Sequence, residues 1–191
     1  MKQPAVGEPG RVSLYNIANW LTVARIALVP LVVIGLMAGG TVWRLVALAA
    51  FGVASVTDLL DGRLARSRGL VTDFGKIADP VADKALTGAA LICLSGLGEL
   101  PWWVTAVIMA RELGVTVLRF WVIRRGVIAA SRGGKVKTVL QILAISLYIL
   151  PWGNAVVRDT AMGAALVVTV VTGFDYVLQA MRLRRGEEGA R

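Results

Sequence analysis

Hydrophobic residues along the chain form six runs of membrane-spanning length, separated by glycine, proline or charged residues. The runs cover residues 20–38, 42–65, 74–96, 101–123, 136–152 and 157–181. Residues 11–19, before the first run, are expected to form a short helix at the membrane interface. Because the connections are short, the pattern predicts an all-α, polytopic membrane helical bundle with six transmembrane helices and a short N-terminal interfacial helix.

A soluble domain of this length could not bury the apolar residues of the chain. Hydrophobic residues make up 57% of the 191 residues, and too much of their surface would have to face water. The pattern divides the chain into an N-terminal tail with the interfacial helix at 1–19, a membrane domain at 20–182 and a basic tail at 183–191. The sequence has no histidine, which excludes imidazole chemistry, and its single cysteine, Cys93, excludes an intrachain disulfide.

The net charge of +9 is distributed unevenly between the two ends of the predicted bundle. One end carries only Arg44 and Arg158. The opposite end carries fourteen basic residues: Lys2, Arg11, Arg63, Arg66, Arg68, Arg124, Arg125, Arg132, Lys135, Lys137, Arg182, Arg184, Arg185 and Arg191. Because basic residues collect on the cytoplasmic side of membrane proteins, both termini are expected in the cytoplasm and the protein in the cell (inner) membrane. The asymmetry accounts for most of the charge and argues against nucleic acid as a partner.

Four aspartates lie where the second and third runs approach the cytoplasmic side. Asp58 and Asp61 are three residues apart, and Asp79 and Asp83 are four apart, so each pair shares one helix face. Ionised carboxylates near hydrocarbon cost free energy unless they are paired, and four together repel one another. Two divalent cations would neutralise them, and hard oxygen ligands suit Mg²⁺ or Mn²⁺.

Small and basic residues beside these acids suggest a ligand that carries phosphate. Gly62 and Gly75 leave room for a bulky group, and Arg66, one turn after Gly62, is placed to hold a phosphate. Asp73, next to Thr72, is expected to be the N-cap of the third helix. The set favours two-metal phosphoryl transfer on a lipid phosphoanhydride. The residues alone leave open an ion-coupled transporter, which also buries carboxylates, and a non-catalytic membrane scaffold.

The spacing of these residues resembles the signature of the CDP-alcohol phosphatidyltransferase family. The matching residues are Asp58, Asp61, Gly62, Ala65, Arg66, Gly75, Asp79 and Asp83, with eight residues between Arg66 and Gly75. The resemblance implies six transmembrane helices, a dinuclear metal site on the cytoplasmic side, a CDP-linked lipid as substrate and, frequently, a homodimer.

The resemblance also implies a role for each matching residue. Asp58, Asp61, Asp79 and Asp83 correspond to the metal ligands, and Asp83 corresponds in addition to the proposed general base for the acceptor hydroxyl. The positions expected to bind the CDP-lipid are Asp58, Gly62, Ala65, Arg66, Thr72 and Gly75.

Basic residues on the fourth and fifth predicted helices are candidates for binding an anionic acceptor. Arg111, Glu112 and Arg119 fall within one arc of the fourth helix, and Arg111, near mid-span, is expected to bind a ligand or to pair with Glu112. Lys135 and Lys137 lie at the start of the fifth helix, where a helix N-terminus also favours an anion. Alternatively, these two lysines only extend toward the membrane surface. We expect Arg111, Lys135, Arg119 and Lys137 to form the acceptor-binding set.

Three stretches resemble the branch of the family that uses glycerol 3-phosphate as the acceptor. They are residues 16–25, 110–113 and 134–138, with Ala18 where proline is common. The resemblance therefore predicts transfer of a phosphatidyl group from CDP-diacylglycerol to glycerol 3-phosphate. A sibling enzyme that uses inositol phosphate or another alcohol is the alternative.

Overall fold

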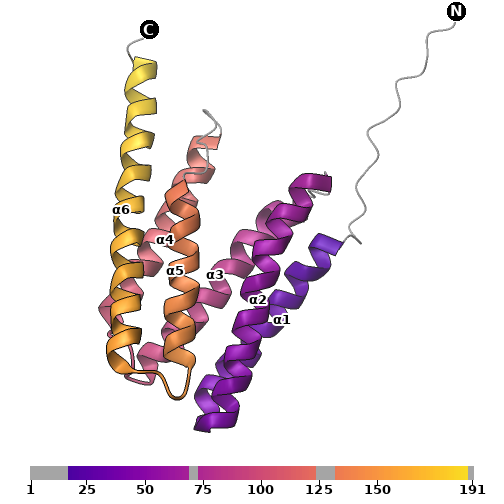
Figure 1. Cartoon of the computed structure of the whole chain (residues 1–191). Coiled ribbons are helices and arrows are strands. Elements are labelled where there is room, and N and C mark those ends of the chain that lie inside the picture. Colours follow the sequence, from indigo (N-terminus) through magenta and orange to yellow (C-terminus); the bar gives the residue numbers. More distant parts are fainter. Residues whose placement is uncertain (1–16, 69–72, 124–131, 189–191) are drawn as a thin grey trace, which may run out of the picture.

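Six α-helices make up the part of the chain that the structure describes (Figure 1). The computed structural model describes residues 17–68, 73–123 and 132–188, with side chains at 20–58, 81–118, 134–179 and 181. The helices are α1 (Ile17–Ala38), α2 (Gly40–Arg68), α3 (Asp73–Gly96), α4 (Trp102–Ile123), α5 (Arg132–Ile149) and α6 (Ala155–Glu188). These described residues contain no strand, so the all-α prediction is confirmed for them.

The helices correspond one to one to the six predicted apolar runs, and the largest shifts of their ends occur at α5 and α6. α5 ends at Ile149 rather than at residue 152, because Pro151 lacks the amide hydrogen that a continuing helix needs. α6 continues to Glu188, past the predicted end of the membrane domain at residue 182. The first part of the predicted basic tail is therefore helical.

Three of the described helices are long and apolar enough to cross a membrane. These segments are Trp20–Ala38 in α1, Gly40–Asp58 in α2 and Ala155–Gln179 in α6. Transmembrane passage of α3, α4 and α5 stays a prediction. The predicted interfacial helix also stays one, because residues 11–16 lie outside the described part and residues 17–19 are the first residues of α1.

Glycines with positive φ and a capping asparagine form the tight turns at one end of the bundle. Gly39 and Gly40, between α1 and α2, have φ of 70° and 75°, a backbone conformation that residues with a Cβ rarely adopt. Gly98, between α3 and α4, has φ of 74°. Between α5 and α6, the Asn154 side-chain oxygen accepts a hydrogen bond from the Val156 amide at 2.9 Å and caps α6. Short turns at these three places make each pair of consecutive helices antiparallel.

The helices pack as two groups of three. α1 packs against α2 and α3, while α6 packs against α5 and α4. Contacts of α5 with α2 and α3, and of α4 with α3, join the two groups. Figure 1 shows α1 and α2 on one side of the molecule and α5 and α6 on the other. Buried apolar side chains such as Phe51, Leu91, Ile108 and Ile145 form the core along the junction.

Exposed tryptophans gather at the end of the bundle that carries the three short turns. Trp43, Trp102, Trp103 and Trp152 lie in or next to these turns and are all exposed. Trp20 is exposed at the opposite end, near the start of α1. Tryptophan is enriched at both membrane–water interfaces. This distribution favours a bundle whose two ends lie at the two surfaces of a bilayer.

The close approach of α1 and α2 depends on Gly35. A Cβ at this position would lie 2.7 Å from the Trp43 carbonyl oxygen and 2.9 Å from the Ala47 Cβ. Gly35→Ala should therefore force the two helices apart and destabilise the bundle by about 1–3 kcal/mol. The matched control is Gly52→Ala in α2, where an added Cβ would meet nothing within 4 Å. Thermal unfolding in detergent would measure both variants, and equal midpoints would contradict the predicted steric cost.

Candidate functional site

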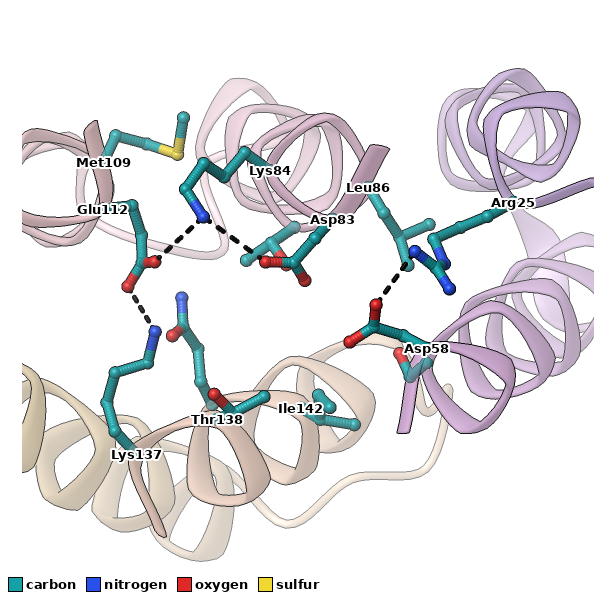
Figure 2. A pocket seen from close by; sticks show the side chains of 13 residues that line it. Arg25, Asp58, Asp83, Lys84, Leu86, Met109, Glu112, Lys137, Thr138 and Ile142 are labelled. Atoms are coloured by element: carbon teal, nitrogen blue, oxygen red, sulfur yellow. Dashed lines mark hydrogen bonds and ion pairs between the residues drawn. The ribbon is translucent and has the colours of Figure 1, made fainter. Parts of the chain in front are cut away.

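A small cavity lies where five helices meet at the junction of the two groups (Figure 2). It is lined by Arg25 from α1, Ser55 and Asp58 from α2, Asp83, Lys84, Leu86 and Thr87 from α3, Met109 and Glu112 from α4, and Lys137, Thr138, Gln141 and Ile142 from α5. Seven of these thirteen side chains are apolar or neutral hydrogen-bonding groups, and the other six carry charge. Charged groups inside a helical bundle are costly unless they are paired, so their contacts show how the site is built.

An ion pair between α1 and α2 forms one wall of the cavity. The Arg25 Nη1 atom lies 2.9 Å from the Asp58 Oδ1 atom. The Arg25 side chain is 1% exposed, whereas that of Asp58 is 31% exposed. The arginine is thus sealed within the protein, and the carboxylate stays open toward the cavity. The pair fixes the orientation of one of the four predicted metal ligands.

Lys84 lies between two carboxylates from different helices. Its Nζ atom is 3.5 Å from the Asp83 Oδ2 atom and 3.7 Å from the Glu112 Oε2 atom. Figure 2 shows the ammonium group between Asp83 and Glu112, with a dashed line to each. Lys84 therefore connects the α3 segment that carries the predicted general base to α4.

Glu112 is the carboxylate around which the cations of the second helix group are arranged. Its Oε1 atom accepts a hydrogen bond from Lys137 and another from the Arg111 Nη1 atom at 3.2 Å. Lys84 approaches the other carboxylate oxygen. The Glu112 side chain is 9% exposed and that of Lys137 is 8% exposed. One buried carboxylate thus faces three cations, from α3, α4 and α5.

Arg111 turns away from the cavity and toward α6. Its Nη2 atom donates a hydrogen bond to the Thr172 hydroxyl at 3.0 Å, and its guanidinium lies 6.0 Å from the centre of the Tyr176 ring. A Cβ on Gly173 would come within 3.0 Å of the Arg111 side chain, so the glycine makes room for it. Arg111 links Glu112 to α6, and the expected pairing with Glu112 is present.

The predicted site residues are distributed unequally in the structure. Asp58, Asp83 and Lys137 line the cavity, whereas Lys135 is exposed and Arg111 lies behind Glu112. The side chains of Asp61, Gly62, Ala65, Arg66, Gly75, Asp79 and Arg119 lie outside the described set, although their backbones belong to α2, α3 and α4. Thr72 lies outside the described residues altogether. The roles of all the predicted site residues, these eight included, stay predictions.

Arg25 and Lys84 are cavity residues that the analysis of the sequence did not assign to the site. Arg25 lies in an otherwise uncharged helix and Lys84 follows the last aspartate of α3, and an intramembrane cation requires a partner. That signal was available in the sequence. Their partners, however, lie on other helices, so spacing along the chain could not identify them.

The carboxylates at the cavity fit the donors that a hard divalent cation prefers. Asp58 and Asp83 come from α2 and α3, and both stay partly exposed, at 31% and 40%. Asp61 and Asp79 lie about one turn away on the same helices. Among the residues whose side chains are described, no group of three or more aspartate, glutamate, cysteine or histidine residues could hold a metal ion. A two-metal site made by Asp58, Asp61, Asp79 and Asp83 stays a prediction.

Comparison with known proteins shows that most of the chain is similar to phosphatidyltransferases. The model of the family described as CDP-alcohol phosphatidyltransferase matches residues 15–171. A protein of Mycobacterium tuberculosis strain H37Rv, named a probable phosphatidylglycerophosphate synthase, is 52% identical over 94% of this chain and 89% of its own length. A Bacillus subtilis protein named CDP-diacylglycerol–glycerol-3-phosphate 3-phosphatidyltransferase is 40% identical over 85% of this chain and 94% of its own length. A protein of the same name from Pectobacterium atrosepticum is 34% identical over 90% and 96%.

The charge balance around Glu112 gives a test of the cavity wall. Glu112→Gln keeps the shape of the side chain but leaves the buried Lys137 and the partly buried Arg111 without their counter-charge. Removing one partner of a buried ion pair costs about 3–5 kcal/mol, so the variant should unfold at a clearly lower temperature in detergent. The control is Asp175→Asn, the same chemical change at an exposed position on α6, which should leave the midpoint near that of the wild type. Equal unfolding midpoints for the two variants would show that the charge of Glu112 does not stabilise the protein.

Proposed function

The chain belongs to the CDP-alcohol phosphatidyltransferase family, and we propose on that basis that it transfers a phosphatidyl group from CDP-diacylglycerol to glycerol 3-phosphate. The products are phosphatidylglycerol phosphate and CMP. The observation that carries this proposal is the cavity in which Asp58 and Asp83 from one helix group face Lys137 and Glu112 from the other. Carboxylates for metal ions and a cation for an anionic acceptor thus adjoin one space. Membership in this family favours the enzyme over the transporter and the scaffold.

The aspartates supply the reaction chemistry in this scheme. Asp58, Asp61, Asp79 and Asp83 would hold two divalent cations, Mg²⁺ or Mn²⁺, which when bound supply charge neutralisation of the pyrophosphate. The acceptor hydroxyl oxygen attacks the phosphorus attached to diacylglycerol, and Asp83 takes the hydroxyl proton as the new phosphorus–oxygen bond forms. The bond from this phosphorus to the oxygen of CMP breaks, and CMP leaves. Lys84, 3.5 Å from Asp83, holds that carboxylate in place.

The residues around the aspartates would divide the two substrates between them. Gly62, Ala65, Arg66, Thr72 and Gly75, with Asp58, are proposed to bind the CDP-lipid. Lys137 lines the cavity and is proposed to bind the acceptor phosphate, with Lys135 and Arg119 at the adjoining ends of α5 and α4. Arg111 is proposed to support acceptor binding indirectly, through its hydrogen bond to Glu112.

Charge and family also support a proposal for orientation and assembly. We propose that both termini and the site lie in the cytoplasm, because the sequence predicts fourteen basic residues on that side of the bundle and such residues collect on the cytoplasmic side of membrane proteins. All six helices cross the cell (inner) membrane, with the membrane domain at 20–182 between short N- and C-terminal tails. We further propose that two copies form a homodimer.

The activity has a direct test with purified protein. CMP release should require CDP-diacylglycerol, glycerol 3-phosphate and Mg²⁺ or Mn²⁺ together, and excess chelator should abolish it because four carboxylates cannot organise a pyrophosphate without counter-charge. Inositol phosphate should not replace glycerol 3-phosphate. CMP release with inositol phosphate but not with glycerol 3-phosphate would instead support the activity of the sibling enzyme. Full turnover in chelator would contradict the metal site.

The role of Asp83 can be separated from metal binding. Asp83→Asn keeps one oxygen ligand but cannot accept the proton, so single-turnover CMP release should fall by about 10²–10⁴-fold while metal-dependent binding of CDP-diacylglycerol persists. Asp159→Asn, at the opposite end of the bundle, serves as the control and should turn over like the wild type. If Asp83→Asn also fails to bind CDP-diacylglycerol, Asp83 acts chiefly as a metal ligand.

A further inference from the structure

Gln141 is a cavity residue that the scheme above does not use. It lies on α5, lines the cavity, and is 3% exposed. Its Nε2 atom is buried and has no hydrogen-bond partner among the described residues. A buried polar group without a partner costs about 1–3 kcal/mol, and native proteins rarely leave one unpaired. The amide therefore needs an acceptor atom in the cavity, which the oxygen of a bound ligand would supply.

The position of Gln141 on α5 indicates which part of a ligand it would meet. Gln141 follows Lys137 by four residues, so the two side chains lie on one helix face about 6 Å apart along the axis. Lys137, with Lys135, lies nearer the start of α5. The ammonium groups thus lie toward the end of the bundle from which a water-soluble anion would enter, and the amide lies one turn deeper. Asp83 contributes to the same cavity from α3.

Glycerol 3-phosphate carries three oxygen functions in a row, and the cavity offers a group for each. Its phosphate suits Lys137, and the terminal hydroxyl that reacts must reach Asp83. The middle hydroxyl lies between these two and would need a neutral partner, since it neither reacts nor carries charge. Gln141 is a neutral, buried donor that lines the same cavity as Lys137 and Asp83.

We propose that Gln141 is a specificity-determining residue whose Nε2 atom donates a hydrogen bond to the middle hydroxyl of the acceptor. This inference rests on the proposed function, because it assumes glycerol 3-phosphate in this cavity. A site that pairs a buried donor with a substrate hydroxyl rejects an analogue that lacks the hydroxyl, because the donor is then left unpaired. Gln141 thus selects a phosphorylated polyol over a simple phosphorylated alcohol.

The test compares two acceptors in three proteins. Glycerol 3-phosphate and propane-1,3-diol monophosphate share the phosphate and the terminal hydroxyl, and only the first has the middle hydroxyl. The wild type, Gln141→Leu and Thr169→Val are assayed for kcat/KM with each acceptor at saturating CDP-diacylglycerol. Thr169 is a matched control, because it is fully buried in α6, its hydroxyl lacks a partner among the described residues, and it does not line the cavity.

The expected result is a loss confined to one acceptor. The wild type should prefer glycerol 3-phosphate by at least about tenfold, the ratio that corresponds to one hydrogen bond. Gln141→Leu should lose about that factor with glycerol 3-phosphate and keep the wild-type kcat/KM with the analogue, so the preference disappears. Thr169→Val should retain the wild-type preference for glycerol 3-phosphate. Gln141→Met provides a second variant of similar size if the leucine variant does not fold.

Each of the other outcomes would overturn the assignment for a different reason. If Gln141→Leu loses kcat/KM equally with both acceptors, the amide contacts the phosphate instead. If kcat/KM falls with neither acceptor, Gln141 does not contact the acceptor. A wild type that does not distinguish the two acceptors also overturns it. If metal-dependent CDP-diacylglycerol binding falls in Gln141→Leu, the amide serves the CDP-lipid instead. If the wild type releases CMP with neither acceptor, the proposed function itself fails, and that result is visible without any variant.

Discussion

The structure depends on the requirement that ionised side chains inside the bundle be paired. Glu112 meets that requirement for three cations from three helices, Lys84, Arg111 and Lys137. Desolvating an unpaired charge costs far more than one such contact returns, so the relative positions of α3, α4 and α5 are constrained by charge as well as by apolar packing. Arg25 and Asp58 impose a similar constraint on α1 and α2. The cavity is the place where these two sets of pairs adjoin.

The helices could be predicted from the sequence because hydrophobicity alone distinguishes a lipid-embedded run from its flanks. All six runs became helices, and α3 begins at Asp73, where a polar cap was expected. The ends were less predictable. The end of α5 is set by Pro151 rather than by the loss of apolar residues, and α6 continues through charged residues to Glu188 because helix formation does not stop at the membrane surface.

The contacts inside the site were predictable only in part. The faces shared by the aspartates follow from helix periodicity, and the pairing of Arg111 with Glu112 follows from adjacency and the cost of a buried cation. Helix periodicity, however, gives only the direction in which a side chain leaves its own helix. It does not say which neighbouring helix lies in that direction. Arg111 pairs with Glu112 as expected, but its further contacts with Thr172 and Tyr176 of α6 could not be read from spacing along α4. The bridge made by Lys84 between α3 and α4 likewise has no signature in spacing along the chain.

The division of the bundle into two groups has a consequence for how the substrates would meet. The aspartates come from α2 and α3, in the first group, whereas Lys137 and Gln141 come from α5, in the second. A lipid-linked substrate held by one group and a soluble acceptor held by the other can react only when the two groups bring their reacting atoms close together. Near the reacting carboxylate, Lys84 connects them through Asp83 and Glu112. The same lysine that neutralises the interior thus also ties the position of the proposed general base to the helix group that would bind the acceptor.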